Sequence, residues 1–299
     1  MEILVTGGAG FLGSHLVDAL IERGDRVIVF DDLSRGSSSQ VADGAVLVEG
    51  DVRSMQDWEN IFQSYSPQII HHLAAVNGTR RFHKEADLVV DVNVNGTRNA
   101  LQCAKKYGCR MIFYSSPESF GEQESMPLSN DSDSIFTPAH LHQRHSYGTS
   151  KHIGELLCQF EVRNGLDVRI ARPCNAYGPR LHGDDNGQVV SMMMAADPIV
   201  VHGDGSQTRC LTWVGDVIEG LLKLNDMDGL EGKAFNLGSV DEITMLELAN
   251  HISQLRGVEI THSSPNYGDS KRRLPDISMN EVISWKARTS LSQGLSQLR

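Results

Sequence analysis

Residues 2–13 read Glu2-Ile3-Leu4-Val5-Thr6-Gly7-Gly8-Ala9-Gly10-Phe11-Leu12-Gly13, and this stretch decides the fold. The apolar run predicts a short buried strand, and the glycines after it predict a turn that leads into a helix. Gly7, Gly10 and Gly13 would allow the tight turn, close approach of backbone to a pyrophosphate, and close packing of the helix on the strand. The helix N-terminus then faces the anion, so we expect a dinucleotide-binding unit.

A second strand is predicted at residues 26–30, and it runs into Asp31 and Asp32. A carboxylate at this point can accept hydrogen bonds from the adenosine ribose, and it repels a 2′-phosphate. The pattern therefore predicts NAD as the cofactor. Arg35 nearby keeps NADP as the alternative.

Strand-like apolar runs alternate with segments of helical period in the first part of the chain. We expect strands at 3–5, 27–30, 46–48, 69–73, 111–114 and 168–171, and helices at 12–23, 55–64, 86–107 and 147–164. This order predicts an α/β fold of Rossmann type, a doubly wound parallel sheet with helices on both faces.

Beyond about residue 175 the pattern becomes mixed, with short strands near 199–202 and 234–237 and helices near 214–224 and 245–256. It predicts a smaller C-terminal α/β substrate domain. We expect an NAD-binding domain at 1–174 and the substrate domain at 175–299, interwoven across an approximate boundary. Residues 127–145 are expected to form a polar loop.

The composition excludes several classes of protein. With 27 basic and 38 acidic residues the net charge is −11, which argues against nucleic acid as a partner. We expect neither a signal peptide nor a membrane-spanning segment, because no apolar run is long enough. The five cysteines are odd in number and lack CxxC spacing, so we expect no disulfide framework, no metal site and a reducing cytoplasmic location.

Tyr147 and Lys151 stand four residues apart in a predicted helix and therefore share one face. A cation beside a phenol favours the phenolate, so we expect Lys151 to lower the pKa of Tyr147 and to make it a base near neutral pH. A surface pair with no chemical role is the alternative, and further motifs must decide.

Those motifs are Gly50-Asp51-Val52, His72-Leu73-Ala74-Ala75, Asn93 in Asn-Val-Asn-Gly-Thr, and Asn175-Ala176-Tyr177-Gly178-Pro179-Arg180. Together with the glycine loop and the Tyr147–Lys151 pair, they resemble the extended short-chain dehydrogenase/reductase family of sugar-nucleotide epimerases, dehydratases and decarboxylases. The resemblance runs from residue 1 to about residue 288.

The resemblance implies a nucleotide sugar as substrate, transient oxidation at C4 by NAD, and a homodimer built on the helices at 86–107 and 147–164. It also implies the cofactor-binding residues Gly7, Gly10, Phe11, Leu12, Gly13, Asp31, Asp32, Asp51, Val52, Leu73, Ala74, Ala75, Asn93, Tyr147 and Lys151.

The segment Tyr114-Ser115-Ser116-Pro117-Glu118-Ser119-Phe120-Gly121 bears on the reaction. Ser116 occupies the place of the family's Ser or Thr that binds the C4 oxygen. Glu118 stands where the family's decarboxylases and dehydratases carry a glutamate, although a merely solvated carboxylate is the alternative. Pro117 replaces the acid that dehydratases place just before that glutamate, which counts against dehydration.

Segments at 184–191, 203–209 and 273–277 look like those of UDP-glucuronate decarboxylases. In this interpretation Arg209 and Arg273 hold the diphosphate or substrate, since guanidinium forks match both phosphate and carboxylate. Arg273 also matches an arginine proposed as a proton donor in related decarboxylases. Asn175 and Val190 are further expected substrate contacts.

The loop Val76-Asn77-Gly78-Thr79-Arg80-Arg81-Phe82 departs from the family, whose decarboxylases usually carry a proline-containing loop here. Arg80 and Arg81 would bind a sugar carboxylate, or else form a solvated basic pair.

The sequence therefore predicts a decarboxylase that converts UDP-glucuronate to UDP-xylose. Its expected catalytic residues are Tyr147, Lys151, Ser116, Glu118 and Arg273. The alternative is a 4-epimerase of a UDP-hexose or UDP-uronate. A dehydratase, or a protein that binds NAD and a sugar nucleotide without turnover, is less favoured.

Two clusters are expected to have no chemical role. His140, His142 and His145 have spacing that suits a metal but lie in the polar loop without a second set of ligands. Met192, Met193 and Met194 are expected to pack in the core of the substrate domain.

Overall fold

The computed structural model describes residues 1–141, 143–184, 186–265 and 270–298. A central sheet of seven parallel strands has the order β11-β6-β5-β4-β1-β2-β3. The strands are β1 (Glu2–Thr6), β2 (Arg26–Asp31), β3 (Val46–Glu49), β4 (Ile69–His72), β5 (Arg110–Tyr114), β6 (Val168–Pro173) and β11 (Ala234–Leu237). The predicted α/β class and doubly wound parallel sheet are confirmed.

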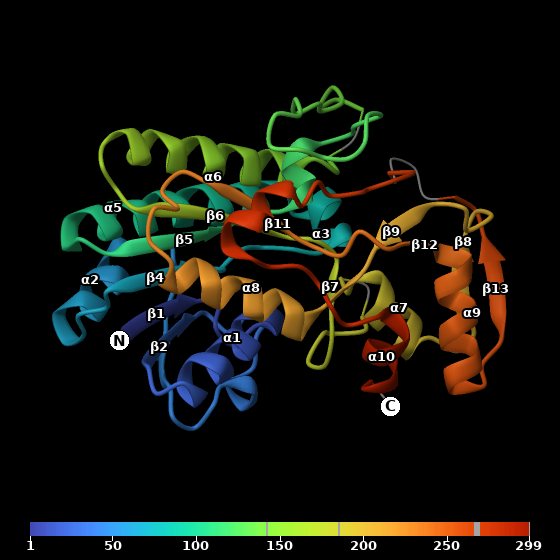
Figure 1. The fold of residues 1–299 in the computed structure, drawn as a ribbon, viewed down its shortest axis with the longest axis horizontal. Coiled ribbons are helices and arrows are strands. Elements are labelled where there is room, and N and C mark those ends of the chain that lie inside the picture. Colours follow the sequence, from blue (N-terminus) through green and yellow to red (C-terminus); the bar gives the residue numbers. More distant parts are fainter. Residues whose placement is uncertain (142, 185, 266–269, 299) are drawn as a thin grey trace.

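Helices cover both faces of this sheet (Figure 1). One face carries α1 (Phe11–Glu22) and α8 (Val214–Asp226), and the other carries α2 (Met55–Ser64), α5 (Gly96–Tyr107) and α6 (Ser146–Arg163). Because successive strand residues point to opposite faces, Val5 packs with the first group and Leu4 with the second. The strands therefore bury apolar side chains on both faces of the sheet.

The helix predicted at 86–107 is interrupted. The chain forms α4 (Ala86–Val90), a π-helical turn (Asp91–Asn95) and then α5. A short helix that was not predicted, α3 (Thr79–Lys84), precedes it after Gly78, whose φ is +130°. Six residues are too few for a helical period to stand out in the sequence.

A smaller lobe lies at the end of the sheet where the strands terminate, on the right of Figure 1. It contains α7 (Val189–Ala195), β8 (Ile199–His202), β9 (Thr208–Cys210), β12 (Glu242–Thr244), α9 (Met245–Arg256), β13 (Ile260–Ser263) and α10 (Leu291–Ser296). β8 pairs with β13 and β9 with β12. Met193 packs in the core of this lobe, whereas Met192 is more exposed.

The chain returns to the large sheet after residue 174. β11 pairs with β6, and α8 packs against α1, so both elements belong to the large lobe. β7 (Ala176–Tyr177) pairs with β10 (Thr212–Trp213) between the lobes. Short 3-10 turns occur at Ser38–Gln40, Pro117–Phe120 and Ser278–Ile283. The domain boundary near residue 174 stays a prediction.

None of the described helices is both long and apolar enough to cross a lipid bilayer.

Three backbone segments meet closely where β1 leads into α1. Gly7 has a φ of +69°, and a Cβ there would lie 2.8 Å from the backbone nitrogen of Ala74. A Cβ on Gly13 would lie 2.1 Å from the carbonyl oxygen of Gly7. The helix can reach the strand this closely only because these residues lack side chains.

We predict that Gly13→Ala lowers the free energy of unfolding by about 1–3 kcal/mol, because the added methyl group overpacks against backbone. Urea denaturation measures the change. Gly10→Ala is the matched control, since its Cβ would come no closer than 3.3 Å to the Gly7 oxygen and its φ is −84°. Equal losses in the two variants would contradict the close packing.

Candidate active site

A cavity of about 980 Å³ lies at the carboxyl edge of the sheet, between the two lobes. The strand order changes direction beside β1, and ligands of open α/β sheets bind at such a point. The cavity is lined by all the predicted catalytic and substrate-binding residues, namely Ser116, Glu118, Tyr147, Lys151, Arg273, Arg80, Arg81, Asn175, Val190 and Arg209.

The predicted cofactor end is built around the start of α1. No side chain caps this helix at Gly10, so its first N–H groups face the cavity without a side-chain acceptor. Asp31 lies beside it and accepts hydrogen bonds from the N–H groups of Ala9 and Leu33, both at 2.9 Å. Bare helix N–H groups, a glycine loop and a carboxylate fit the diphosphate and ribose of NAD.

Most of the predicted cofactor-binding residues line this end. They are Gly7, Gly10, Phe11, Leu12, Gly13, Asp31, Asp32, Val52, Leu73, Ala74 and Ala75, with Tyr147 and Lys151 farther along the cavity. Asp51 and Asn93 do not line it. Their binding roles stay predictions, and both side chains are engaged elsewhere.

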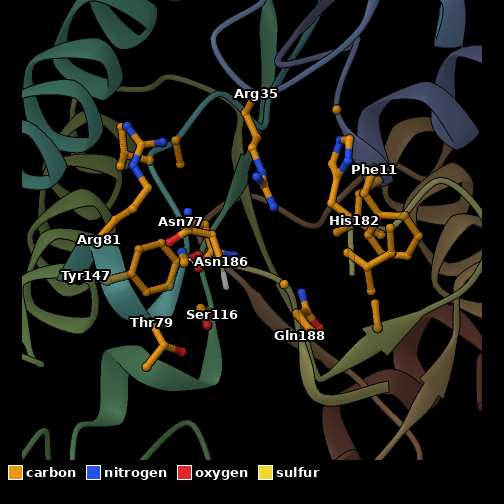
Figure 2. A pocket seen from close by; sticks show the side chains of 18 of the residues that line it. Phe11, Arg35, Asn77, Thr79, Arg81, Ser116, Tyr147, His182, Asn186 and Gln188 are labelled. Carbon is orange, nitrogen blue, oxygen red and sulfur yellow. Dashed lines mark hydrogen bonds between the residues drawn. The ribbon is translucent and has the colours of Figure 1, made fainter. Parts of the chain in front are cut away.

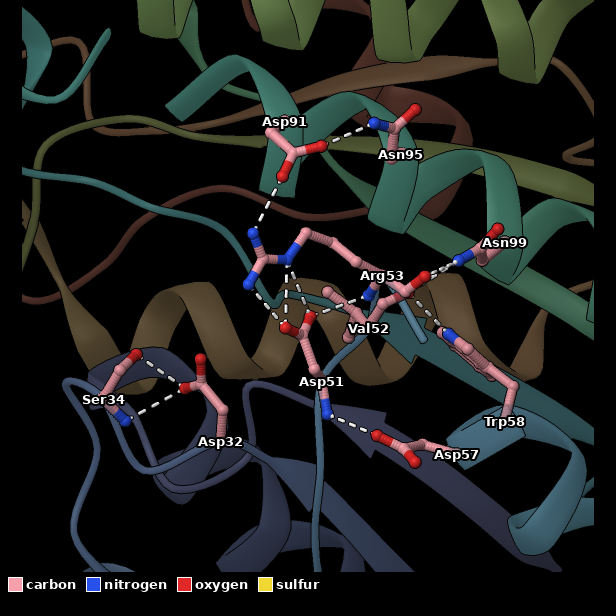
Figure 3. Close-up of polar contacts among 10 residues, drawn as sticks. All are labelled: Asp32, Ser34, Asp51, Val52, Arg53, Asp57, Trp58, Asp91, Asn95 and Asn99. Atoms are coloured by element: carbon pink, nitrogen blue, oxygen red, sulfur yellow. Dashed lines mark hydrogen bonds and ion pairs between the residues drawn. The ribbon is translucent and has the colours of Figure 1, made fainter. Parts of the chain in front are cut away.

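The carboxylate of Asp51 pairs with the guanidinium of Arg53 at 2.6 Å (Figure 3). Arg53 also reaches Asp91 at 2.8 Å. The carbonyl of Val52 accepts hydrogen bonds from Trp58 and Asn99. The surrounding side chains thus fix the backbone so that Val52 lines the cavity, while the carboxylate of Asp51 is paired with Arg53 outside it.

Asn93 holds a loop of the cavity wall. Its side-chain oxygen accepts from the N–H of Val76 at 2.8 Å, and its amide donates to the hydroxyl of Ser150 at 2.9 Å. That hydroxyl donates to the carbonyl of Tyr147. Asn93 lies in the π-helical turn and connects the loop after β4 to α6. The sequence pattern does not predict this contact.

Tyr147 and Lys151 project from the first turns of α6, and both are buried. The ammonium of Lys151 lies 5.6 Å from the centre of the Tyr147 ring and donates to the carbonyl of Tyr114 at 2.7 Å. Burial lowers the pKa of Lys151 to about 8. Phe82 stacks on the other side of Tyr147, with ring centres 4.9 Å apart.

The expected lowering of the Tyr147 pKa is wrong for this geometry. Burial raises the pKa of Tyr147, and the negative charge of Glu118 raises it further, while hydrogen bonding with Ser116 opposes the shift. Spacing along the helix predicted the pairing of phenol and ammonium. It could not predict the carboxylate that a separate segment brings beside them.

Glu118 forms an ion pair with Arg273, in which the guanidinium Nη2 lies 2.9 Å from the carboxylate. Burial alone would raise the pKa of Glu118, but the charges of Arg273, Arg144 and Arg209 outweigh it and the pKa is lowered. Arg273 is 6% exposed, and its Nη1 has no hydrogen-bond partner among the described residues. The cavity wall therefore contains a charged donor, Nη1 of Arg273, that has no acceptor among the described residues.

Ser116 lies between Glu118 and Tyr147. Its hydroxyl accepts from the N–H of Glu118 at 3.2 Å and caps the 3-10 turn at Pro117–Phe120. The side chain of Ser116 also lowers the pKa of Tyr147, against the effect of burial. Ser116, Glu118 and Tyr147 thus form one cluster at the end of β5.

The loop that departs from the family forms one wall of the cavity (Figure 2). Arg81 on α3 is paired with Glu85, just after that helix, at 2.7 Å, and Arg80 is largely exposed. Gly78 lies against Asn186 of the smaller lobe, where an added Cβ would come within 2.9 Å of the Asn186 side chain. The loop therefore touches both lobes.

Two further residues line the cavity, and their contacts were not predicted. Arg35 extends across the opening between Tyr147 and His182 (Figure 2), and its guanidinium grips Asp184 at 2.5 and 2.7 Å. Arg144, just before α6, lines the cavity and acts on the charge of Glu118. The sequence marked Arg35 only as a sign of the NADP alternative. Its contact with Asp184 and the place of Arg144 beside Glu118 join segments far apart in the chain, so no local pattern predicts them.

The structure describes the histidine cluster only in part. His142 lies outside the described residues, and His145 is buried with its Nε2 3.3 Å from Glu122. In the described part of the chain, no three His, Cys, Asp or Glu side chains gather as a metal site requires. Met193 is in the core of the smaller lobe as expected. Met192 and Met193 both line the cavity.

The chain is similar to known proteins over its whole length. It is 36% identical to UDP-glucuronic acid decarboxylase 1 of Arabidopsis thaliana, over all of this chain and 69% of that protein. It is 31% identical to UDP-N-acetyl-alpha-D-glucosaminuronate decarboxylase of Bacillus cytotoxicus, over 98% of this chain and 95% of that protein.

Among solved structures it resembles UDP-glucose 4-epimerase of Thermotoga maritima with UDP-glucose. The TM-score is 0.92 with 30% identity, over 99% of this chain and 97% of that one. Residues 3–238 match the family described as NAD dependent epimerase/dehydratase family. The predicted cofactor, NAD, is the cofactor of this family. On this match, and in agreement with its glycine loop and its Tyr147–Lys151 pair, the chain belongs to the NAD-dependent epimerase/dehydratase family.

Proposed function

We propose that this protein is an NAD-dependent decarboxylase of a UDP-linked uronate, with UDP-glucuronate as substrate and UDP-xylose as product. The observation that carries the proposal is the Glu118–Arg273 pair in the cavity wall, beside Ser116 and Tyr147. Pro117 precedes Glu118, where the family's dehydratases carry an acid. The names of the two decarboxylase relatives give further support.

In the first step Tyr147, as the phenolate, takes the proton of the C4 hydroxyl, which Ser116 orients. Because burial and the charge of Glu118 raise the pKa of Tyr147, this phenolate would need the positive charges of Lys151 and of bound NAD. NAD, when bound, supplies the acceptor for the C4 hydride and later returns that hydride. Lys151 lies behind the phenol, where its charge favours the phenolate that forms. Phe82 and the buried position of Tyr147 keep water from this proton transfer.

In the second step the C4 ketone makes the sugar a β-keto acid. The bond between C5 and the carboxyl carbon breaks, CO2 leaves, and the electron pair passes into an enolate. Glu118 fixes Arg273 beside this position, and the unpartnered Nη1 of Arg273 supplies a positive donor to the developing charge. A proton is then added at C5 before the ketone is reduced.

The charges around the cavity favour an anionic sugar. Arg144, Arg209 and Arg273 all act on Glu118, so three cations surround one carboxylate in a protein of net charge −11. A second carboxylate from a uronate is attracted to this positive region. Arg81 is paired with Glu85, which gives the predicted carboxylate contact by Arg81 less support.

The second candidate is 4-epimerisation, favoured by the similarity to the Thermotoga maritima epimerase. It needs the oxidised sugar to turn over in the site before the hydride returns, and it leaves Glu118 without a chemical task. Mass spectrometry of products from UDP-sugars separates the candidates. Loss of CO2 from UDP-glucuronate or its N-acetylated relative supports the proposal, loss of water indicates a dehydratase, and an unchanged mass with a new isomer indicates an epimerase.

We predict that Glu118→Gln lowers the rate of CO2 release by about a hundredfold or more, because Arg273 loses the charge that orients it. Reduction of bound NAD by UDP-glucuronate should persist, since Tyr147 and Ser116 are unchanged. Absorbance at the NADH band and trapped CO2 measure the two steps separately. Glu124→Gln, at an exposed site after the same turn, is the control and should match wild type. Unchanged CO2 release in Glu118→Gln would overturn the role of Glu118.

We predict that Lys151→Met alters how stability depends on pH. The pKa of Lys151 is about 8 in the folded chain against 10.5 for an ordinary lysine, so the unfolded state binds more protons between these values. Stability of wild type should therefore rise from pH 8 to 10.5, relative to Lys151→Met, by an amount on the order of 3 kcal/mol. Urea denaturation across this range tests it, and Lys105→Met, which is exposed, should show no such trend.

The homodimer implied by the resemblance remains part of the proposal. Leu156 and Phe160 lie one turn apart on α6 and are 58% and 59% exposed. Such an apolar pair on a long surface helix is typical of a subunit contact. α5 lies beside α6, and Lys105 on it pairs with Glu161.

We predict that Leu156→Glu combined with Phe160→Glu yields a monomer, because two buried carboxylates cannot be accommodated in an apolar contact. Light scattering after gel filtration measures the mass. Val282→Glu, at another exposed apolar residue, should leave the dimer intact. A wild-type monomer would contradict the proposed assembly.

We also propose a cytoplasmic location. All five cysteines are buried as free thiols, which suits a reducing compartment.

A further inference from the structure

A buried ion pair lies directly behind the turn that carries Ser116 and Glu118. Glu155 projects from α6 and Arg172 from β6, and their side chains are 13% and 7% exposed. The guanidinium meets both carboxylate oxygens, with Nε at 2.8 Å and Nη2 at 2.6 Å. A two-point contact of this kind fixes the direction of both side chains.

The carboxylate of Glu155 also accepts hydrogen bonds from two serine hydroxyls. Ser115 donates at 2.5 Å and Ser119 at 3.2 Å. These serines flank Ser116 and Glu118 in the sequence, one on each side. Glu155 therefore holds both ends of the segment that faces the substrate cavity.

Arg172 fixes the same segment from another side. Its guanidinium lies 4.6 Å from the centre of the Phe120 ring, at the end of the turn. Its Nη1 donates to the side-chain oxygen of Asn130 at 2.6 Å, and Asn130 in turn donates to the carbonyl of Ala234 on β11. The turn is thus connected to the rigid central sheet.

Glu155 lies on the same helix as Tyr147 and Lys151. Positions 147, 151 and 155 are successive fourth residues and share one face of the helix. The helix also touches the turn directly, since a Cβ on Gly148 would lie 2.3 Å from the carbonyl oxygen of Glu118. One face of α6 therefore carries the proton-transfer pair and the anchor of the opposite wall.

Lys151 is surrounded by groups that are neutral at neutral pH. Burial raises the pKa of Cys158 on α6 and lowers the pKa of His72 on β4 to about 3. Burial likewise raises the pKa of Tyr147. Among these neighbours Glu155 is the ionised one, and its charge favours the protonated form of Lys151.

Tyr114, which ends β5, adds no charge there, because burial raises the pKa of its phenol. Its carbonyl accepts from the Lys151 ammonium.

We propose that Glu155, paired with Arg172, is a positioning residue of this enzyme, which sets Ser116 and Glu118 at the right distance from Tyr147 and places a negative charge one helical turn from Lys151. It touches neither cavity nor substrate and acts through Ser115, Ser119 and Lys151. The proposal rests on the oxidation at C4 assumed in the proposed function. It is independent of the later steps, whether CO2 is lost or the sugar is epimerised.

The test measures the single-turnover rate of NAD reduction by the UDP-sugar that wild type oxidises fastest, with KM and the dependence of the rate on pH. Glu155→Gln removes the charge but leaves Arg172 buried alone, which endangers folding. Glu155→Gln with Arg172→Met removes both charges and avoids that problem. Ser115→Ala with Ser119→Ala keeps the ion pair and releases the turn. Glu161→Gln, near the far end of α6 and paired with Lys105 of α5, is the control.

We expect the two Glu155 variants to reduce NAD about tenfold to a hundredfold more slowly, with KM within about twofold of wild type. Their rate should also begin to fall at a lower pH than in wild type, because the pKa of Lys151 drops without the carboxylate. The serine double variant should slow the reaction to a similar degree with the pH limit unchanged. The control should match wild type in rate and pH profile.

A folded Glu155→Gln, Arg172→Met variant with the wild-type rate and pH profile would overturn the proposal. A serine double variant with the wild-type rate would overturn the positioning of the turn. If wild type oxidises UDP-glucose but releases no CO2 from UDP-glucuronate, the decarboxylase function fails. The Glu155 test then proceeds with UDP-glucose.

Discussion

The close approach of backbone at Gly7 is the constraint that places the cofactor end of the cavity. A Cβ on Gly7 would collide with the backbone of Ala74 after β4, and a Cβ on Gly13 of α1 would collide with the backbone of Gly7. α1 can therefore begin directly at the carboxyl edge of the sheet with its N–H groups uncapped. The cavity opens at this edge, beside the strand where the order of the sheet changes direction. A methyl group at Gly7 or Gly13 would push α1 away from the strand, and this would displace the residues of α1 that line the cofactor end.

Electrostatics organise the other end of the cavity. Burial of Tyr147 and the charge of Glu118 both oppose formation of the phenolate, so the protein by itself does not hold an ionised base. Arg273 and two further arginines keep Glu118 ionised despite its burial. The same arginines make a positive region inside an acidic protein, which suits an anionic sugar. The charge of Glu118 raises the pKa of Tyr147, and the arginines lower the pKa of Glu118.

Contacts between the lobes also shape the walls of this cavity. Arg35 on the large lobe grips Asp184 on the loop before α7, and Gly78 lies against Asn186 of the same loop. Arg180 pairs with Asp18 on α1 at 2.7 Å and fixes the base of that loop. These contacts join segments far apart in the chain, so the cavity has walls from both lobes although the lobes have separate cores.

Reading the residues in order was enough to predict the parallel sheet, the glycine loop, the family and the gathering of Tyr147, Lys151, Ser116, Glu118 and Arg273 in one cavity. These follow from local spacing and from motifs whose order along the chain is kept. Folding was needed to show that β11 completes the large sheet, that Asn93 holds a loop and that Asp51 pairs with Arg53. It also reversed the expected pKa shift of Tyr147 and revealed Glu155 behind the turn. Such effects depend on burial and on charges from distant segments, and neither quantity is encoded in the spacing of neighbouring residues.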